Sequence, residues 1–476
     1  MHRLALLLGL VAAPDIAPAL VQSAPPAERT PNVLLITTDD MGLQAGCYGD
    51  ALAVTPNLDS LAAQGVLFER GYTTQASCSP ARASLLTGLY PHQNGQIGLA
   101  GQHPEFRVKD GTPTLSTLLR NAGYETGILG KLHLSPGDAF PFDFAWPGGS
   151  QAMATRKVRT VADKVAEFLD GPAKDKPFFL YVNYFDPHRP FDQDADQTEG
   201  LPEKPYAPDE VKPLAYLGMD GKPPRAEAAA YYNSIRRMDT GLGLLFDVLK
   251  ERDRWDDTLV IFVSDHGPPF ARAKTTVYEA GVHIPFIVRW PGVSVPGTRT
   301  GAFASLVDIM PTVLDAAGIK PPVMSGRSLR PVLGGDVPDD WRKLLFTEYT
   351  AHAPEHFAPR RTVRDERFKL IHNLLPDHPN PVPYQGSTRP GRGNQLDPAF
   401  EAAYRTMEKP PEWELYDLVS DPFELTNLID EPAKQEEVGR LKAGLLAWRE
   451  ETNDPLLDPD ELLRLKTSRS KKHEKK

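Results

Sequence analysis

The most informative stretch of this chain is Cys78-Ser79-Pro80-Ala81-Arg82-Ala83-Ser84-Leu85-Leu86-Thr87-Gly88. Ser79 is a favourable N-cap residue, Pro80 suits the first helical position, and the Ala- and Leu-rich run after them favours a helix. The stretch therefore predicts that Cys78 lies at the start of a helix, where the helix dipole and the free backbone N–H groups favour anions. Cys47 is the only other cysteine, so a structural thiol or a Cys47–Cys78 disulfide is the alternative interpretation.

Three apolar, β-branched runs elsewhere in the chain end in polar residues. Such runs alternate with helical patterns, which is typical of an α/β fold with a mainly parallel sheet between helices. Ligands of open α/β sheets bind outside the carboxyl ends of the strands, so we expect these polar residues to converge on one crevice. The runs are 33–38 before Asp39-Asp40, 178–185 before Asp186-Pro187-His188, and 259–264 before Asp265-His266.

One helical pattern is long enough to be interpreted by itself. Its apolar side chains recur at steps of three and four residues, which places them on one face of a helix. We interpret this face as part of the core and not as a functional site; it consists of Tyr231, Ile235, Met238, Leu242, Leu245 and Leu249.

The character of the sequence changes after about residue 345. Shorter strands, such as 367–372, and a Pro-, Gly- and Asn-rich loop at 376–398 predict a smaller α+β domain with a short antiparallel sheet. We therefore divide the chain into a catalytic domain at 30–345, a C-terminal α+β subdomain at 346–465 and a basic, disordered tail at 466–476.

The N-terminus has the pattern of a signal peptide, which we assign to residues 1–23. Its apolar stretch at 4–13 is too short to span a bilayer. We expect an exported protein, periplasmic or secreted, without integral membrane association. The net charge of −10 argues against nucleic acid as a partner. Any site for an anion must therefore be local.

The acidic residues at the predicted strand ends favour a metal site. Asp39, Asp40 and Asp265 would repel one another strongly unless a cation held them together. Their hard carboxylate oxygens suit calcium better than zinc. Either pair alone would be about as readily explained by a helix cap or a turn. In combination with Cys78, the metal interpretation is the better one.

The stretch at 78–88 resembles the signature that marks a cysteine of the sulfatase family for oxidation to formylglycine, since the Pro, Arg and Leu-Thr-Gly positions all match. This resemblance implies an alkaline-phosphatase-like fold and a formylglycine-generating enzyme as a partner. Hydrated formylglycine carries two hydroxyls on one carbon. One can attack sulfur, and loss of the proton from the other then expels sulfate. The likeness runs from about residue 30 to 458 and includes 308–312, 413–417 and 421–428.

The resemblance also implies the ligands of the cation. These are Asp39, Asp40, residue 78, Asp265 and His266. Calcium is the expected ion, and magnesium or manganese stays open because a nitrogen ligand is less typical of calcium.

The catalytic residues implied by the family are a mixed set of cationic and proton-transferring groups. Cationic groups would hold the sulfate oxygens and stabilise the charge that develops on them. His188, aided by Lys274, would protonate the leaving atom, and His133 would take the proton of the second hydroxyl. The implied set is Cys78, Arg82, Lys131, His133, His188 and Lys274.

Within the family the likeness narrows to the sulfamidase branch, which cleaves N-sulfate from the glucosamine of heparan sulfate. His266 and Lys274 stand where that branch is expected to have Asn and Arg, and 278–281 is more similar to general O-sulfatases. An O-sulfatase acting on another sulfated glycan is therefore the alternative. The narrower likeness rests on 90–99, 140–144, 178–190, 237–239, 267–270 and 448–455.

One loop is a candidate for substrate binding. It carries His352, Glu355 and His356, which would either contact the sugar or be ordinary solvent-facing polar residues. Two further classes of function stay open. Phosphodiesterases and phosphonate hydrolases share the superfamily fold, and a chain with unconverted Cys78 would be a non-enzymatic glycan-binding protein. The sequence predicts no particular oligomeric state.

Overall fold

Two β-sheets organise the computed structural model, which describes residues 30–148, 155–191, 200–376, 378–382, 388–391 and 393–470. Within these residues, eight strands form the larger sheet in the order β4-β3-β5-β1-β7-β8-β2-β9. Neighbouring strands are parallel, except that β8 runs antiparallel to β7 and β2. The strands are β1 (Asn32–Thr38), β2 (Val66–Tyr72), β3 (Glu125–Leu129), β4 (Phe144–Trp146), β5 (Phe178–Tyr184), β7 (Thr258–Ser264), β8 (Phe286–Arg289) and β9 (Thr298–Ser305).

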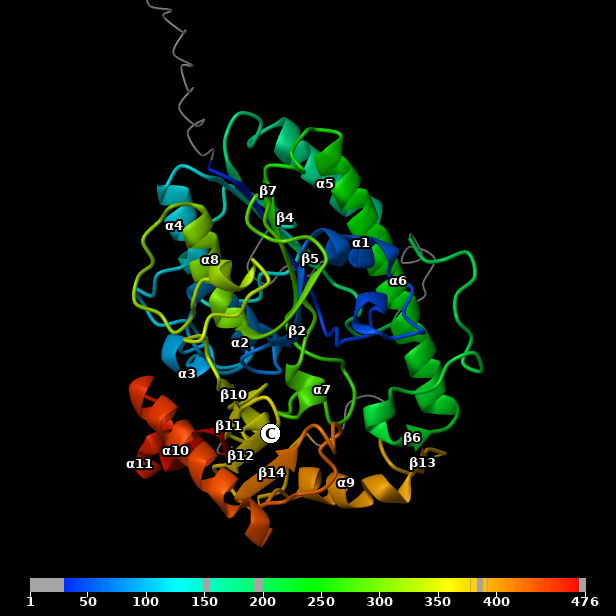
Figure 1. Ribbon diagram of the computed structural model, residues 1–476, viewed down its shortest axis with the longest axis vertical. Coiled ribbons are helices and arrows are strands. Elements are labelled where there is room, and N and C mark those ends of the chain that lie inside the picture. Colours follow the sequence, from blue (N-terminus) through cyan, green and yellow to red (C-terminus); the bar gives the residue numbers. More distant parts are fainter. Residues whose placement is uncertain are drawn as a thin grey trace, which may run out of the picture. The chain divides into compact units, whose positions relative to one another are not determined.

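Helices cover both faces of this sheet (Figure 1). Along β1, the side chains of Leu34 and Ile36 belong to one buried cluster and those of Val33 and Leu35 to another, as the alternation of a strand requires. The first cluster is closed by α1 (Pro56–Gln64), α5 (Val158–Asp170) and α6 (Lys222–Lys250), and the second by α2 (Cys78–Thr87), α4 (Leu115–Asn121) and α8 (Ile309–Ala316). The apolar face predicted for residues 231–249 is the buried face of α6, so its interpretation as core is confirmed.

The smaller sheet is antiparallel and lies below the larger one in Figure 1. Its strands are β10 (Leu345–Tyr349), β11 (Arg360–Arg364), β12 (Phe368–Asn373) and β14 (Trp413–Asp417). Leu370 and Leu415 contribute to a buried cluster with Leu441 and Trp448 of α10 (Gln435–Glu451). The remaining elements are α3 (Pro91–Asn94), α7 (Glu279–Val282), α9 (Glu401–Glu408), α11 (Pro459–Ser470) and the strand pair β6 (Met219–Asp220) and β13 (Gln395–Leu396).

The predicted α/β sandwich with a smaller antiparallel sheet is therefore confirmed. The division into domains at 30–345 and 346–465 stays a prediction, and the signal peptide at 1–23 lies outside the described residues. The tail predicted at 466–476 begins inside α11, so its first residues are helical and not disordered. Leu465 anchors this helix in a small buried cluster, and Arg464 forms ion pairs with Glu461 and Glu105. Residues 471–476 lie outside the description.

Candidate active site

The three polar strand ends meet at one edge of the larger sheet. β1 lies between β5 and β7 and is parallel to both, with Thr38 in register with Tyr184 and Ser264. Because the chain leaves these strands at the same level, Asp39-Asp40, His188 and Asp265-His266 are brought together, as expected for the carboxyl edge of a parallel sheet.

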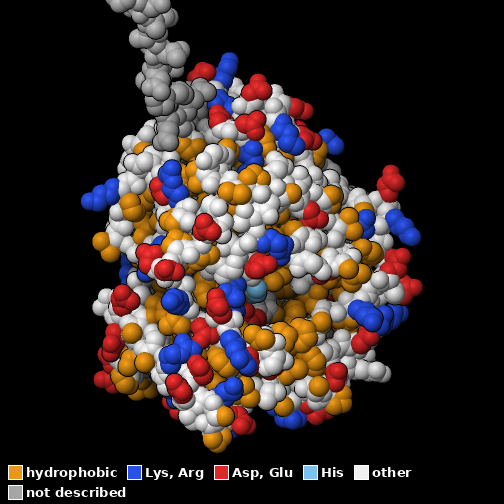
Figure 2. Space-filling model, viewed as in Figure 1, with side chains coloured by type: hydrophobic (Ala, Val, Ile, Leu, Met, Phe, Trp, Pro, Cys, Tyr) orange, Lys and Arg blue, Asp and Glu red, His pale blue; other side chains and the backbone are white. Residues whose placement is uncertain are grey.

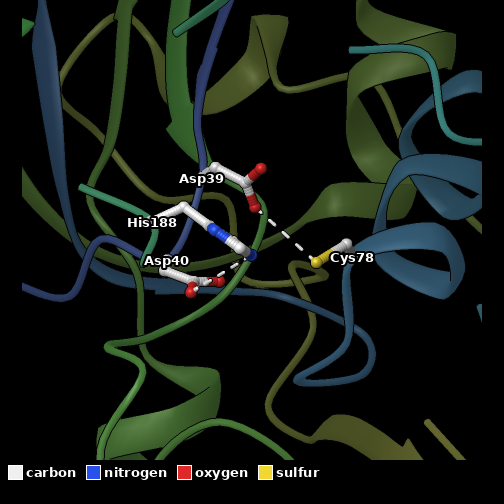
Figure 3. Close-up of side chains that lie close together, drawn as sticks. All are labelled: Asp39, Asp40, Cys78 and His188. Carbon is white, nitrogen blue, oxygen red and sulfur yellow. Dashed lines mark hydrogen bonds and ion pairs between the residues drawn. The ribbon is translucent and has the colours of Figure 1, made fainter. Parts of the chain in front are cut away.

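Cys78 faces this edge from the start of α2. Its Sγ lies 3.6 Å from Asp39 Oδ1 and 3.4 Å from His266 Nε2. Figure 3 shows the thiol and His188 pointing toward the two aspartates. Both Cys47 and Cys78 are free, so the alternative of a disulfide between them is wrong.

The helix begins earlier than predicted. Ser77, and not Ser79, is the N-cap residue of α2, so Ser79 and Pro80 belong to its first turn. The Ser79 hydroxyl accepts a hydrogen bond from the backbone N–H of Ala100 at 3.0 Å, which gives it a partner outside the helix. The error concerns only the cap, because Cys78 still lies at the N-terminal end of α2, where the dipole favours negative charge.

Two lysines bring positive charge to the buried carboxylates. Lys131 Nζ lies 2.7 Å from Asp39 Oδ2, and Lys274 Nζ lies 2.8 and 3.0 Å from the oxygens of Asp40. Lys274 Nζ is also 3.8 Å from Cys78 Sγ. Burial by itself would raise the pKa of the Cys78 thiol, but Lys131 and Lys274 hold it well below its ordinary value. The environment of residue 78 thus stabilises negative charge.

Arg82 lies one turn further along α2 and is fully buried. Its guanidinium donates to Asp265 Oδ2 at 3.2 Å, to the Lys131 carbonyl at 2.9 Å and to Asn183 Oδ1 at 2.5 Å. The third guanidinium nitrogen, Nη2, lies 3.8 Å from Asp39 Oδ2. Arg82 therefore helps to hold the carboxylates of Asp265 and Asp39 in place.

The donor set fits a divalent cation. Two overlapping groups of ligand atoms lie within 4.8 Å of one another: those of Asp39, Asp40, Cys78 and His188, and those of Asp39, Cys78, Asp265 and His266. His266 Nδ1 lies 2.9 Å from the Gly267 carbonyl, which leaves Nε2 to face the aspartates. Burial and the neighbouring Asp39 raise the pKa of Asp265. A bound cation would relieve this like-charge repulsion.

The two histidines assigned to proton transfer both lie near the Cys78 thiol. His188 Nε2 is 3.8 Å from Asp40 Oδ2, and its side chain is 22% exposed. His133 lies next to the Cys78 thiol, and its buried Nδ1 has no hydrogen-bond partner among the described residues. Burial lowers the pKa of His133 below its ordinary value, so its imidazole is neutral near pH 7 and able to accept a proton.

The candidate substrate loop connects β10 to β11 and reaches the start of α2. His352 Nδ1 lies 2.9 Å from the hydroxyl of Ser77, next to Cys78, and the His352 and His356 rings are 6.0 Å apart. Burial, together with the charge of Lys274, holds the pKa of His352 well below its ordinary value. Glu355 is exposed. Figure 2 shows a histidine side chain at the bottom of a hollow, with hydrophobic side chains along one side of it and a basic side chain on the other.

Several residues of the site were missed from the sequence. Asn183 accepts hydrogen bonds from Arg82 and from Thr37 at 2.5 and 2.6 Å. Tyr231, assigned only to the core, donates its hydroxyl to the Asp40 carbonyl at 3.2 Å. The one signal for Asn183 is that a polar amide interrupts the apolar run 178–185.

Comparison with known proteins identifies the family. The sulfatase family model matches residues 31–319, and the model described as the C-terminal part of N-sulphoglucosamine sulphohydrolase matches residues 271–378. The chain is 34% identical to N-sulphoglucosamine sulphohydrolase of Homo sapiens, over 92% of this chain and 94% of that protein. It is also 29% identical to an ulvan-active sulfatase of Formosa agariphila, over 93% of this chain and 85% of that protein.

A solved structure supports the same assignment of fold. It is the structure of another protein in complex with its substrate, D-glucosamine-2-N,6-O-disulfate. It superposes with a TM-score of 0.69 at 22% identity, covering 89% of this chain and 98% of that one. The fold and the matches together define a hydrolase of the alkaline-phosphatase-like class. The chain belongs to the sulfatase family. No helix of the described residues is long and apolar enough to cross a membrane.

Proposed function

We propose that this protein is a sulfamidase that hydrolyses the N-sulfate of glucosamine in heparan sulfate or heparin, with residue 78 acting as formylglycine. The observation that carries the proposal is the position of Cys78 within its signature, between the carboxylates of the strand ends and two buried lysines. The similarity to the human N-sulphoglucosamine sulphohydrolase along nearly the whole chain supports the substrate class.

Asp39, Asp40, Asp265, His266 and residue 78 would hold the divalent cation. We propose calcium, with magnesium or manganese as alternatives, because carboxylate oxygens predominate among the ligands. When bound, the cation would neutralise the buried carboxylates and acidify a hydroxyl at residue 78. Formylglycine would supply that hydroxyl, and a second one whose deprotonation releases sulfate.

Side chains of the protein itself would perform the remaining tasks. Lys131 and Lys274, which contact Asp39 and Asp40 respectively, would bind the sulfate oxygens as charge develops on them. His188, partly exposed at the rim, would give its proton to the leaving nitrogen, and the buried neutral His133 would take a proton from residue 78. By analogy with oxyanion-hole donors, loss of one such group would cost about 3 kcal/mol of transition-state stabilisation.

The substrate loop would add recognition of the sugar. His352, held against Ser77, is close enough to residue 78 to contact a bound sugar ring, and His356 stacks beside it. Glu355, which is exposed, would contact only the parts of a substrate that extend toward solvent.

An O-sulfatase is the second candidate. It is favoured by His266 and Lys274, by the 278–281 segment, and by the similarity to an ulvan-active sulfatase over 93% of this chain. The two candidates differ in the leaving atom, nitrogen or oxygen, and not in the groups that would hold the sulfate.

The decisive experiment compares two substrates on protein of known modification state. The peptide containing residue 78 is analysed by mass spectrometry, after which sulfate released from N-sulfoglucosamine and from 6-O-sulfated glucosamine is measured by ion chromatography. We expect formylglycine at position 78 and sulfate only from the N-sulfated sugar; a Cys78→Ala variant is the control. Full activity of unconverted protein would contradict the mechanism, and release only from the 6-O-sulfated sugar would assign the protein to the second candidate.

We also propose export of the protein, to the periplasm or outside the cell, by way of the N-terminal signal peptide. A formylglycine-generating enzyme of the host would then act on the signature of residues 78–88. Recovery of mature protein from the exported fraction, with its N-terminus determined by sequencing, tests this part.

A further inference from the structure

One strand-end carboxylate singled out in the sequence has no place in the proposed reaction. Asp186 follows β5, as Asp39 follows β1, yet it belongs to neither group of candidate metal ligands. Its carboxylate is instead bound by two arginines. Arg156 Nε lies 2.9 Å from Oδ1, and Arg237 lies 2.6 Å from Oδ2 and 2.9 Å from Oδ1. All three side chains are buried, and together they are called here the Asp186 cluster.

Arg156 also binds the backbone on which His188 is carried. Its Nη2 donates to the carbonyl of His188 at 2.7 Å and to that of Pro190 at 2.5 Å. Its guanidinium lies over the ring of Phe185 at 4.2 Å, and that ring is 4.8 Å from the imidazole of His188. Arg156 thus contacts the segment before, at and after His188.

This arrangement is a poor device for stability alone. Burying a carboxylate with two guanidinium groups carries a desolvation cost that the attraction between them does not reliably offset. A hydrogen-bonded ion cluster does, however, fix geometry more tightly than apolar side chains would, because each bond prescribes a direction. The contacts of the Asp186 cluster lead to His188, whose side chain is partly exposed.

We propose that Arg156, supported by Arg237 through Asp186, is a positioning residue that holds His188 in place to protonate the leaving atom. The inference rests on the proposed function, in which His188 is the proton donor. As the bond between sulfur and the leaving atom breaks, its electron pair goes to the leaving atom, and the proton of His188 goes to the same atom. Loss of Arg156 weakens this transfer without touching the groups that hold the sulfate.

A series of aryl sulfates tests the proposal, because the need for a proton differs along it. 4-Nitrophenyl sulfate has a leaving group that departs without protonation, whereas the leaving group of phenyl sulfate depends on it. In Arg156→Gln we expect kcat/KM for phenyl sulfate to fall by about tenfold or more relative to 4-nitrophenyl sulfate, within the range that general acid catalysis contributes. Arg156→Lys, which keeps the charge, is expected to lie between this variant and the wild type.

Two further variants calibrate the series. His188→Gln removes the proton donor itself and is expected to give the same selective loss. Arg361→Gln is the matched control, because Arg361 is also buried and forms a two-pronged ion pair with Asp454 at 2.9 and 2.9 Å. Among the described residues, its other polar partners are Thr350, Arg360 and Glu348, and not the segment of His188. This variant is expected to lower the melting temperature and to change kcat/KM for all the aryl sulfates by one common factor.

The outcomes separate the inference from the proposed function. If both Arg156 variants changed kcat/KM for all the aryl sulfates by one common factor, as expected for Arg361→Gln, the positioning role would be overturned. Absence of selective loss in His188→Gln would overturn it as well, while turnover that depends on formylglycine at position 78 would leave the sulfatase reaction standing. Failure of converted wild-type protein to hydrolyse any aryl or sugar sulfate would overturn both.

Discussion

Asn183 offers the sharpest test of how the site is held together. Its Oδ1 accepts hydrogen bonds from Arg82 at 2.5 Å and from Thr37 at 2.6 Å, and its Nδ2 donates to the Leu129 carbonyl at 3.2 Å. One buried amide on β5 therefore joins α2, β1 and β3. Leucine in its place has the same number and branching of side-chain heavy atoms, and it can form none of these hydrogen bonds.

The cost of Asn183→Leu follows from these contacts. A hydrogen bond to a charged group contributes about 1.5–3 kcal/mol and a neutral one about 1 kcal/mol. The three bonds therefore sum to about 4 kcal/mol of lost stability. For a chain of 476 residues, an unfolding entropy of about 2 cal/mol/K per residue converts this loss into a fall in Tm of about 4 °C. Activity should fall too, since Arg82 holds Asp265.

Calorimetry and aryl sulfate kinetics on the same preparation test both parts. The matched control is Asn373→Leu on β12, because Asn373 is also buried and donates to the Pro411 carbonyl and to Glu414, at 2.7 and 2.8 Å. We expect the control to lose stability and keep kcat. An Asn183→Leu protein that loses less than about 1 kcal/mol, or that loses stability with an unchanged kcat, would refute this account of the site.

Three other perturbations have defined outcomes. Cys78→Ser is expected to abolish sulfate release, measured by ion chromatography, with an unchanged Tm; residual turnover would contradict the role of residue 78. Chelation by EDTA is expected to lower Tm in scanning calorimetry because buried carboxylates then repel one another, calcium is expected to restore it, and Asp265→Asn is expected to weaken that response; a Tm indifferent to EDTA would argue against the cation. Burial by itself would raise the pKa of Asp454, but the ion pair with Arg361 outweighs this effect and holds the pKa below its ordinary value. Its stabilising effect is therefore present at neutral pH and lost below about pH 4, so Asp454→Asn is expected to flatten the acid limb of Tm against pH; an unchanged limb would contradict this.

The convergence of the site was predictable because it follows from topology. Parallel neighbours end at one edge of a sheet, so apolar runs that terminate in Asp39-Asp40 and Asp265-His266 place these residues together whichever helices connect them. The start of α2 was predictable only to within two residues. Ser77 and Ser79 are both acceptable caps by composition, and the partners that distinguish them come from Ala100 and His352, far along the chain.

The ion pairs that support the site, between Asp186 and two arginines, could not be predicted from the sequence in the same way. Asp186 has the same sequence context as Asp39, a polar residue after an apolar strand, yet it binds two arginines and not the candidate metal cluster. Arg156 and Arg237 come from different segments, and no local pattern connects either of them to Asp186. Pairings of this kind depend on how helices are stacked on the sheet, which periodicity does not encode.

The contact between His352 and Ser77 has a consequence for how such enzymes diverge. Asp39, Asp265 and Lys131 follow the ends of strands of the large sheet, whereas His352 lies on the connection between β10 and β11 of the small one. Insertions or replacements in that connection leave the register of β1, β5 and β7 intact. Given the proposed role of His352, mutations in this one loop can change which sulfated sugar is bound, while the residues that remove the sulfate stay the same.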